Sequence, residues 1–267
     1  ENVSGLRRPA PHGTPSSLSK RRTTTVVGFL GPVLQIGRWH WGYNSSLPKT
    51  HARRRRACQE NLAMEYKFVN ALAKAAAGKD PEKVKEALAT GDDVSAKDSI
   101  EQTALILCVR DRAIDEAEAA KLAECAKLLI EAGADVNTAD AYGDQPLALA
   151  CMDGGGVPKV KAVQHLLEAK ADVLALTENF KMTSLHWASI CGSKDVAKLL
   201  IDAGARKNKI DRNRDTPIAI ARGQLKRLEE NLDYFGKEYT GDDKPQQTKK
   251  YKTLIEYFES VPGLKKD

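Results

Sequence analysis

The stretch from Lys181 to Asn208 most constrains what this chain can fold into, because weaker copies of it occur before and after it. Its spacing predicts two short antiparallel helices with a break at Cys191 and Gly192, and Asp195 as the N-cap of the second helix. Gly204 follows that helix, where the backbone needs a positive φ. A unit this small cannot bury both of its apolar faces alone, so it must stack on its copies.

The copies fall into two columns that stay in register. One column opens the first helix of each unit: Thr103–Cys108, Gln145–Ala150, Thr183–Ala188 and Thr216–Ala221. The other column follows the second helix: Ala89–Ser95, Glu131–Asn137, Glu168–Leu174 and Asp202–Asn208. These residues resemble the ankyrin repeat family, whose signature is D-x-x-G-x-T-P-L-H-x-A, then a leucine-rich helix and G-A-D-V-N. The resemblance runs from about Met64 to the C-terminus and implies an all-α ankyrin repeat solenoid of about five repeats.

The chain departs from that signature at positions where left-handed backbone is expected. The glycine of the hairpin tip is kept once, as Gly143, and is replaced elsewhere by Glu101, Lys181 and Arg214. After the second helix, Lys170 stands where the other repeats carry glycine. A left-handed lysine there would cost about 1 kcal/mol.

Residues 1–63 form a basic leader that we expect to have little stable structure, and residues 64–267 form the repeat domain. The leader carries eleven Lys/Arg against two acids, whereas the rest of the chain carries 31 against 34. The net charge of +6 therefore belongs to the leader. Its apolar run, Val26–Ile36, is too short to span a bilayer.

Three interpretations of the leader remain open. Its Arg- and Ser-rich, acid-poor composition is that of an organellar transit peptide, and Met64 after it suggests upstream sequence that the working protein lacks. A secretory signal is less favoured, because no A-x-A cleavage site follows the apolar run. The cluster Arg53–Arg56 is interpreted as a solvated charge run, not a nucleic-acid site, because no aromatic residues are interleaved with it. We expect an intracellular, cytoplasmic protein, or an organellar one (mitochondrion or plastid) if the leader is a transit peptide.

Three repeats are longer than the repeat around Lys181–Asn208, and the extra residues fall between their two helices. We place these insertions at residues 111–120, 153–158 and 223–250. They should emerge from one edge of the solenoid, opposite the hairpins. The first and third are charged with helical spacing, so they should lengthen helices, whereas the second contains DGGGVPK and should be a loop.

No constellation of residues in the sequence points to catalysis, a cofactor or a metal. The glycines before Lys159 lack the P-loop spacing, and no Ser or Thr follows the lysine. His186 resembles the family's T-P-L-H histidine, which implies a structural role. The five cysteines form no C-x-x-C pair and have no histidine at zinc spacing, so the protein is not expected to be an enzyme or to bind metal.

The surface is therefore the best candidate for function. The resemblance implies that a partner protein docks on the concave face made by hairpin tips and first helices. Three of four tips carry large apolar residues, Ile100, Tyr142 and Phe180, either as anchors for the partner or as packing between neighbouring tips. The fourth tip carries Arg212 and Arg214, whereas the first two hairpins are acidic, so charge should orient the partner.

This pattern predicts a non-catalytic protein-interaction module or scaffold. The alternative is a regulatory or structural subunit of a larger (enzyme) complex, with the insertions as its contact surface. Nucleic acid is not expected as a ligand, because acidic hairpins would repel its phosphates. A small-molecule ligand is not expected either.

Overall fold

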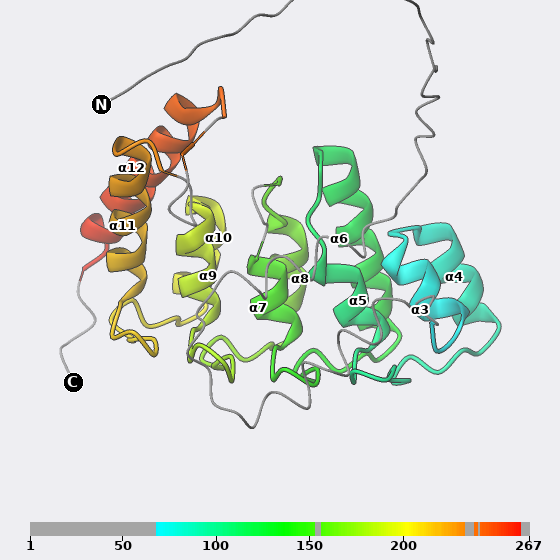
Figure 1. The fold of residues 1–267 in the computed structure, drawn as a ribbon. Coiled ribbons are helices and arrows are strands. Elements are labelled where there is room, and N and C mark those ends of the chain that lie inside the picture. Colours follow the sequence, from blue (N-terminus) through cyan, green and yellow to red (C-terminus); the bar gives the residue numbers. More distant parts are fainter. Residues whose placement is uncertain (1–67, 153–155, 233–237, 240, 263–267) are drawn as a thin grey trace, which may run out of the picture. The chain divides into compact units, whose positions relative to one another are not determined.

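Helices in the described part of the chain form five consecutive antiparallel pairs (Figure 1). The structure is a computed structural model and describes residues 68–152, 156–232, 238–239 and 241–262, all of which belong to one compact unit. The first helices of the pairs are α3 (Ala71–Ala77), α5 (Ala104–Arg110), α7 (Pro146–Cys151), α9 (Ser184–Cys191) and α11 (Pro217–Glu229). The second helices are α4 (Pro81–Ala89), α6 (Glu116–Glu131), α8 (Val160–Glu168), α10 (Lys194–Asp202) and α12 (Lys244–Ser260).

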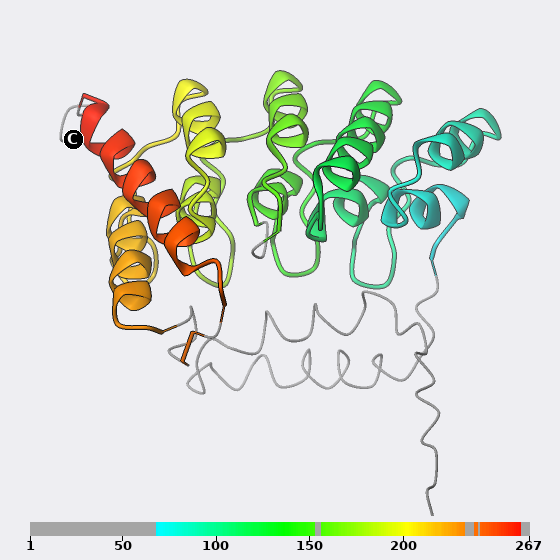
Figure 2. The same cartoon turned by 90° about the horizontal axis from the view of Figure 1, so that it is seen from above.

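The pairs stack into two rows of helices within this unit (Figure 2). Each first helix packs on the first helix of the next pair, and each second helix packs on the next second helix. Hairpins connect one pair to the next. The described residues thus confirm the predicted all-α solenoid.

The two rows bury their residues differently. In α7 and α9 all residues but the last of α9 are buried, because these short helices are covered by neighbouring repeats and by their own second helix. The second helices bury one stripe each, such as Val196, Ala197 and Leu200 in α10. This one-sided burial is what the apolar spacing in the sequence predicts.

Local sequence explains where most helices begin and end. The side chains of Thr103 and Thr216 accept hydrogen bonds from the third helical residue, as N-caps do. Lys170 adopts a φ of 67° after α8, where Gly204 has 100° after α10. The N-cap of α10 is Ser193, not Asp195; the prediction was wrong because the helix begins two residues earlier and places Asp195 in its first turn, where a carboxylate favours the helix dipole.

The segments proposed as insertions include parts of the helices: residues 116–120 lie in α6, 223–229 in α11 and 244–250 in α12. Residues 153–155, 233–237 and 240 of these segments lie outside the described residues. Helix α6 has 16 residues and α12 has 17, against nine in α10. Residues 111–115 connect α5 to α6, and one backbone hydrogen bond, from Val157 N to Ala113 O at 2.9 Å, joins this segment to the corresponding one in the third repeat.

A buried lysine fixes the edge of the solenoid where these segments lie. Lys159 is 1% exposed. Its Nζ donates to four carbonyl oxygens: Val109 (2.6 Å), Asp111 (3.2 Å), Leu149 (3.0 Å) and Met152 (3.2 Å). These carbonyls belong to the C-terminal ends of α5 and α7, whose unpaired carbonyls and dipoles favour a cation. One ammonium group therefore joins the second repeat to the third.

Lys79 has a related role one repeat earlier. It is largely buried, and its Nζ donates to the carbonyl of Arg112 and to Glu118, each at 2.8 Å. The connection between α5 and α6 is thus held from both sides by lysines of other repeats.

None of the helices in the described ranges has the length and apolar character needed to cross a bilayer.

Candidate partner-binding face

The hairpin tips lie in a row, and each is built by a short polar residue. In the first, second and fourth hairpins an aspartate side chain accepts the backbone N–H of the tip residue: Asp98 from Ile100 (2.9 Å), Asp140 from Tyr142 (2.9 Å) and Asp211 from Asn213 (2.8 Å). This Asx-turn geometry orients the tip without using its side chain. Ile100, Tyr142 and Phe180 are half-buried, so each has one packed and one solvent-facing side.

Neighbouring hairpins are tied together through their backbones. Ala141 N donates to Ile100 O at 3.0 Å, and Arg212 N donates to Phe180 O at 2.9 Å. The ring of Phe180 also meets Trp187 of α9 edge-on, with centroids 6.1 Å apart. The packing role considered for the tips is therefore observed at Phe180.

The third hairpin is one residue longer than the others. Thr177 and Thr183 are six apart, whereas the equivalent residues of the second hairpin, Asp140 and Gln145, are five apart. In this hairpin Glu178 crosses over Gly143: a Cβ added at Gly143 would lie 2.3 Å from Cγ of Glu178. Glycine adopts its φ of 77° without strain and leaves room for this side chain, whereas the equivalent Glu101, Lys181 and Arg214 adopt a positive φ at some cost.

The acidic charge of the second hairpin is directed inward. Asp140 and Asp144 are both buried, at 7% and 5% exposure. Burial, together with the carboxylates of Asp140 and Glu178, raises the pKa of Asp144 to about 7. The second hairpin is therefore less negative towards solvent than a count of its acids predicts.

Stability should fall as the pH rises through this titration. A carboxyl whose pKa is raised on folding stabilises the protein while it is protonated, so its contribution is lost between pH about 4 and about 7. A shift of this size corresponds to about 4 kcal/mol as an upper limit. We expect Asp144→Asn to be more stable than wild type at pH 8 and equal to it only below pH about 4, in urea titrations at each pH. Glu256→Gln, at an exposed site on α12, is the control and should leave the pH dependence unchanged.

The two arginines proposed for partner binding have different surroundings. Arg212 is exposed, and its Nη1 donates to the carbonyl of Asn179 at 3.0 Å, so it also links the third and fourth hairpins. Arg214 is exposed at the tip, where it adopts a left-handed φ of 69°. Asp211, just before them, is buried, and one of its oxygens is used by the turn. The fourth hairpin therefore presents mainly positive charge.

His186 has the structural role that the sequence implied. Its Nδ1 accepts the backbone N–H of Thr183 (3.1 Å), and its Nε2 lies 3.2 Å from the carbonyl of Asp215 in the next hairpin. Because Nδ1 accepts, Nε2 carries the proton and donates. Burial lowers the pKa of His186, which favours this neutral form.

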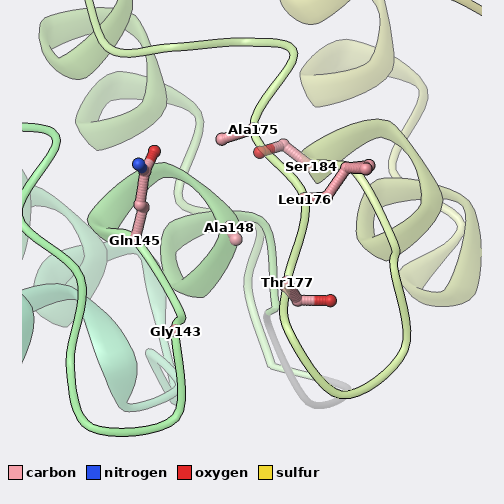
Figure 3. A pocket seen from close by; sticks show the side chains of 7 residues that line it. All are labelled: Gly143, Gln145, Ala148, Ala175, Leu176, Thr177 and Ser184. Atoms are coloured by element: carbon pink, nitrogen blue, oxygen red, sulfur yellow. The ribbon is translucent and has the colours of Figure 1, made fainter.

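The third repeat lacks this histidine and has a hollow in its place. Ala148 is the equivalent of His186, and Gln145 is the equivalent of the N-cap Thr183. Figure 3 shows the hollow between Ala148 and the next hairpin, near Ala175 and Ser184. Its volume is about 10 Å³, room for about one water molecule. Gln145 makes no cap hydrogen bond to α7, and its buried Oε1 has no hydrogen-bond partner.

Restoring the missing pair should stabilise the protein. In Gln145→Thr with Ala148→His, threonine would cap α7 and the imidazole, which is larger than the hollow, would extend through it to reach the next hairpin. We expect a gain of about 1–2 kcal/mol in the free energy of unfolding, from one cap and one hydrogen bond. Chemical denaturation of the double variant and both single variants checks this. A double variant no more stable than wild type would show that the hollow does not accommodate the imidazole.

Within the described residues, no group of three or more His, Cys, Asp or Glu side chains could hold a metal ion. Four cysteines there are free thiols, and burial together with the neighbouring thiol of Cys125 raises the pKa of Cys108. Cys108 has no exposed surface, as its place in the column of small residues predicted.

The sequence matches the family model for ankyrin repeats in three overlapping copies, at residues 72–175, 114–211 and 157–226. Among curated proteins, it is 37% identical over 90 residues to NF-kappa-B inhibitor alpha of Sus scrofa, and 34% identical over 83 residues to B-cell lymphoma 3 protein of Homo sapiens. These alignments cover 32% and 31% of this chain, and 27% and 18% of the relatives. A third match, 30% identical over 129 residues, is to neurogenic locus notch homolog protein 1 of Xenopus tropicalis; it covers 37% of this chain and 5% of that protein. The chain thus spans about a quarter or less of the length of these relatives.

Proposed function

The chain belongs to the ankyrin repeat family, and we propose that it binds a partner protein along the face made by its hairpin tips and first helices. Ankyrin repeats are protein–protein interaction modules. What supports the proposal for this face is the row of tips, in which the turns at the half-buried Ile100 and Tyr142 are held by aspartate side chains and the ring of Phe180 meets Trp187 edge-on. Rigid, half-buried apolar side chains bind with little loss of conformational entropy.

Truncating two tips tests this face. Tyr142→Ala with Phe180→Ala should mainly speed dissociation of the partner, by an amount on the order of 2 kcal/mol or more if both are hot spots. Surface plasmon resonance with a partner identified by crosslinking in the native cell measures this. The wild-type protein and the double variant must first give equal circular dichroism spectra and melting curves. Unchanged dissociation in the folded double variant would exclude the tips as anchors.

The arginines should act on association instead. Arg212→Glu with Arg214→Glu should slow association in a salt-dependent manner, because rim charges steer the encounter. Arg212 also bonds to Asn179, so Arg214→Glu alone separates steering from loss of that link.

A second candidate is a subunit that contacts its assembly through the inserted segments. One observation favours it: Ile114, in the connection pinned by Lys79 and Lys159, is 68% exposed. An exposed isoleucine on a backbone held in place by hydrogen bonds is suited to a permanent contact with another subunit. Ile114→Ser should then release the protein from a native complex, whereas the tip variant should not; native mass measurement of the purified complex distinguishes the two candidates.

We further infer that the protein is not an enzyme, since ankyrin repeats are generally non-catalytic. A match to the serine/threonine-protein kinase VIK of Arabidopsis thaliana covers only 15% of that protein and suggests no catalytic role here. We place the protein inside the cell because it carries free thiols, in the cytoplasm or in an organelle if residues 1–63 act as a transit peptide.

A further inference from the structure

We propose that the partner engages the third and fourth hairpins through an extended segment in which apolar side chains alternate with Asp or Glu. This inference rests on the proposed function and names the chemistry of the partner. It concerns the stems, the six residues that lead into each hairpin turn, at 93–98, 135–140, 172–177 and 206–211. The face in question, here called the stem face, comprises Leu174, Leu176 and Ile210 with Arg206 and Lys209.

The apolar residues of the stem face are not needed to build a stem. Leu174, Leu176 and Ile210 are 45%, 36% and 48% exposed, and they account for three of the five most exposed large apolar side chains in the described residues. At the positions of Leu174 and Leu176, the first stem carries Ser95 and Lys97, and the second carries Asn137 and Ala139. Since these stems form the same turn with polar or small residues, the apolar side chains in the later stems serve the surface.

The first position of the fourth stem also departs from the others. There the first three stems carry Asp93, Asp135 and Asp172, whose carboxylates each accept the backbone N–H two residues later at 2.8–2.9 Å. The fourth stem carries Arg206, which cannot accept such a bond. A local stabilising contact is thus exchanged for an exposed cation.

Further cations surround the same stem. Lys209 is exposed where the earlier stems carry Ala96, Thr138 and Ala175, and exposed Arg212 and Arg214 follow at the tip. Of the two acids in this hairpin, Asp211 is buried and Asp215 is exposed, so the exposed cations outnumber the exposed acids. The hydrogen bond from Arg212 N to Phe180 O holds the third and fourth hairpins side by side, so the apolar and basic residues lie on adjacent hairpins.

This combination selects a partner segment of stated chemistry. Exposed cations favour Asp and Glu, and the two leucines and the isoleucine favour apolar side chains. An extended segment that lies edge-on to this surface directs successive side chains to its two sides, so apolar residues can meet the leucines and isoleucine on one side and acidic residues the cations on the other. A phosphate backbone would satisfy the cations and leave the apolar residues uncovered, so a protein segment is favoured over nucleic acid.

The experiment compares the wild-type protein with variants whose new residues are taken from its own other stems. The apolar variant carries Leu174→Asn, Leu176→Ala and Ile210→Ala. The charge variant carries Arg206→Asp and Lys209→Thr. Lys97→Ala in the first stem is the matched control. The probe is a random linear peptide display library selected on the wild-type protein, followed by fluorescence anisotropy with the enriched peptides and with a short DNA duplex, all on variants shown to be folded.

We expect enriched peptides to carry alternating acidic and apolar residues, and to bind about tenfold more weakly or worse to the apolar variant. The charge variant should also bind weakly, with a smaller salt dependence, and the control should bind as wild type does. Peptides without this pattern, or none at all, would overturn the inference. The inference would also be overturned if the DNA duplex bound the apolar variant but not the charge variant, because the site would then be a polyanion site. If the enriched peptides bound both stem variants as they bind wild type but did not bind the Tyr142/Phe180 variant, the stem face would be refuted and the proposed function supported.

Discussion

Lys159→Met should lower the free energy of unfolding by about 3–5 kcal/mol, although it keeps the length and apolar stem of the side chain. The substitution removes the ammonium group that bonds to four carbonyl oxygens at the ends of α5 and α7. The buried carbonyls of Val109 and Leu149 would lose this donor beside two negative helix ends, although the Leu149 oxygen would keep its bond from Met152 N at 3.2 Å. Equilibrium denaturation in urea, followed by circular dichroism, measures the loss.

The neighbouring lysine provides the control. Lys161 lies in the first turn of α8 and is exposed, so Lys161→Met removes the same charge without uncovering any carbonyl. We expect it to change stability by less than about 0.5 kcal/mol. If both variants unfolded at the same urea concentration, water would be satisfying the carbonyls and the buried lysine would not join the two repeats.

Leu200→Ala should cost about 2–5 kcal/mol, because this residue is fully buried in α10 at the centre of the fourth repeat. Helix α10 packs against α8, α9 and α12, so a cavity there weakens the contacts on both sides of the repeat. In a repeat protein each unit is stabilised mainly by its neighbours. The variant should therefore lose the single transition of the wild type, or melt as a whole at lower temperature.

A local probe distinguishes these two results. Trp187 lies in α9 of the same repeat, and replacing Trp39 and Trp41 by Phe makes it the one fluorescent tryptophan. In Leu200→Ala, the fluorescence of Trp187 should then change at a lower denaturant concentration than the circular dichroism signal of the helices. Lys198→Ala, at an exposed position of α10, should leave both curves together. If the denaturant midpoint and slope of Leu200→Ala equalled those of wild type, the assigned register of the repeats would be contradicted.

The repeat architecture was predictable because it depends on local signals that recur. The two columns of similar residues fixed the number of units, and the residues after each second helix fixed the left-handed positions, including Lys170. The structural role of His186 followed from its place in the column. Counting residues between Thr177 and Thr183 would also have shown the longer third hairpin, since the spacing is visible in the sequence.

Other features depend on contacts between residues far apart in the chain, and no spacing reveals them. Lys159 follows a glycine-rich loop, but its carbonyl partners at Val109 and Asp111 are about fifty residues away. From the sequence, Asp144 was expected to carry surface charge. In the structure, burial and the carboxylate of Glu178 in the next hairpin raise its pKa. The exposed residues of the stems could not be predicted either, because the sequence pattern of a stem does not show which of its side chains face solvent. The proposed anchors Ile100, Tyr142 and Phe180 stay predictions until a partner is tested.

The ammonium group shared by α5 and α7 also matters for a protein under tension. If the two ends of the repeat domain are pulled apart, a stack of independent units would yield one at a time from either end. Here the bonds of Lys159, with the hydrogen bond between Val157 and Ala113, make the second and third repeats one mechanical element. The outer repeats should detach first, and this pair should give way last in a single, longer extension step.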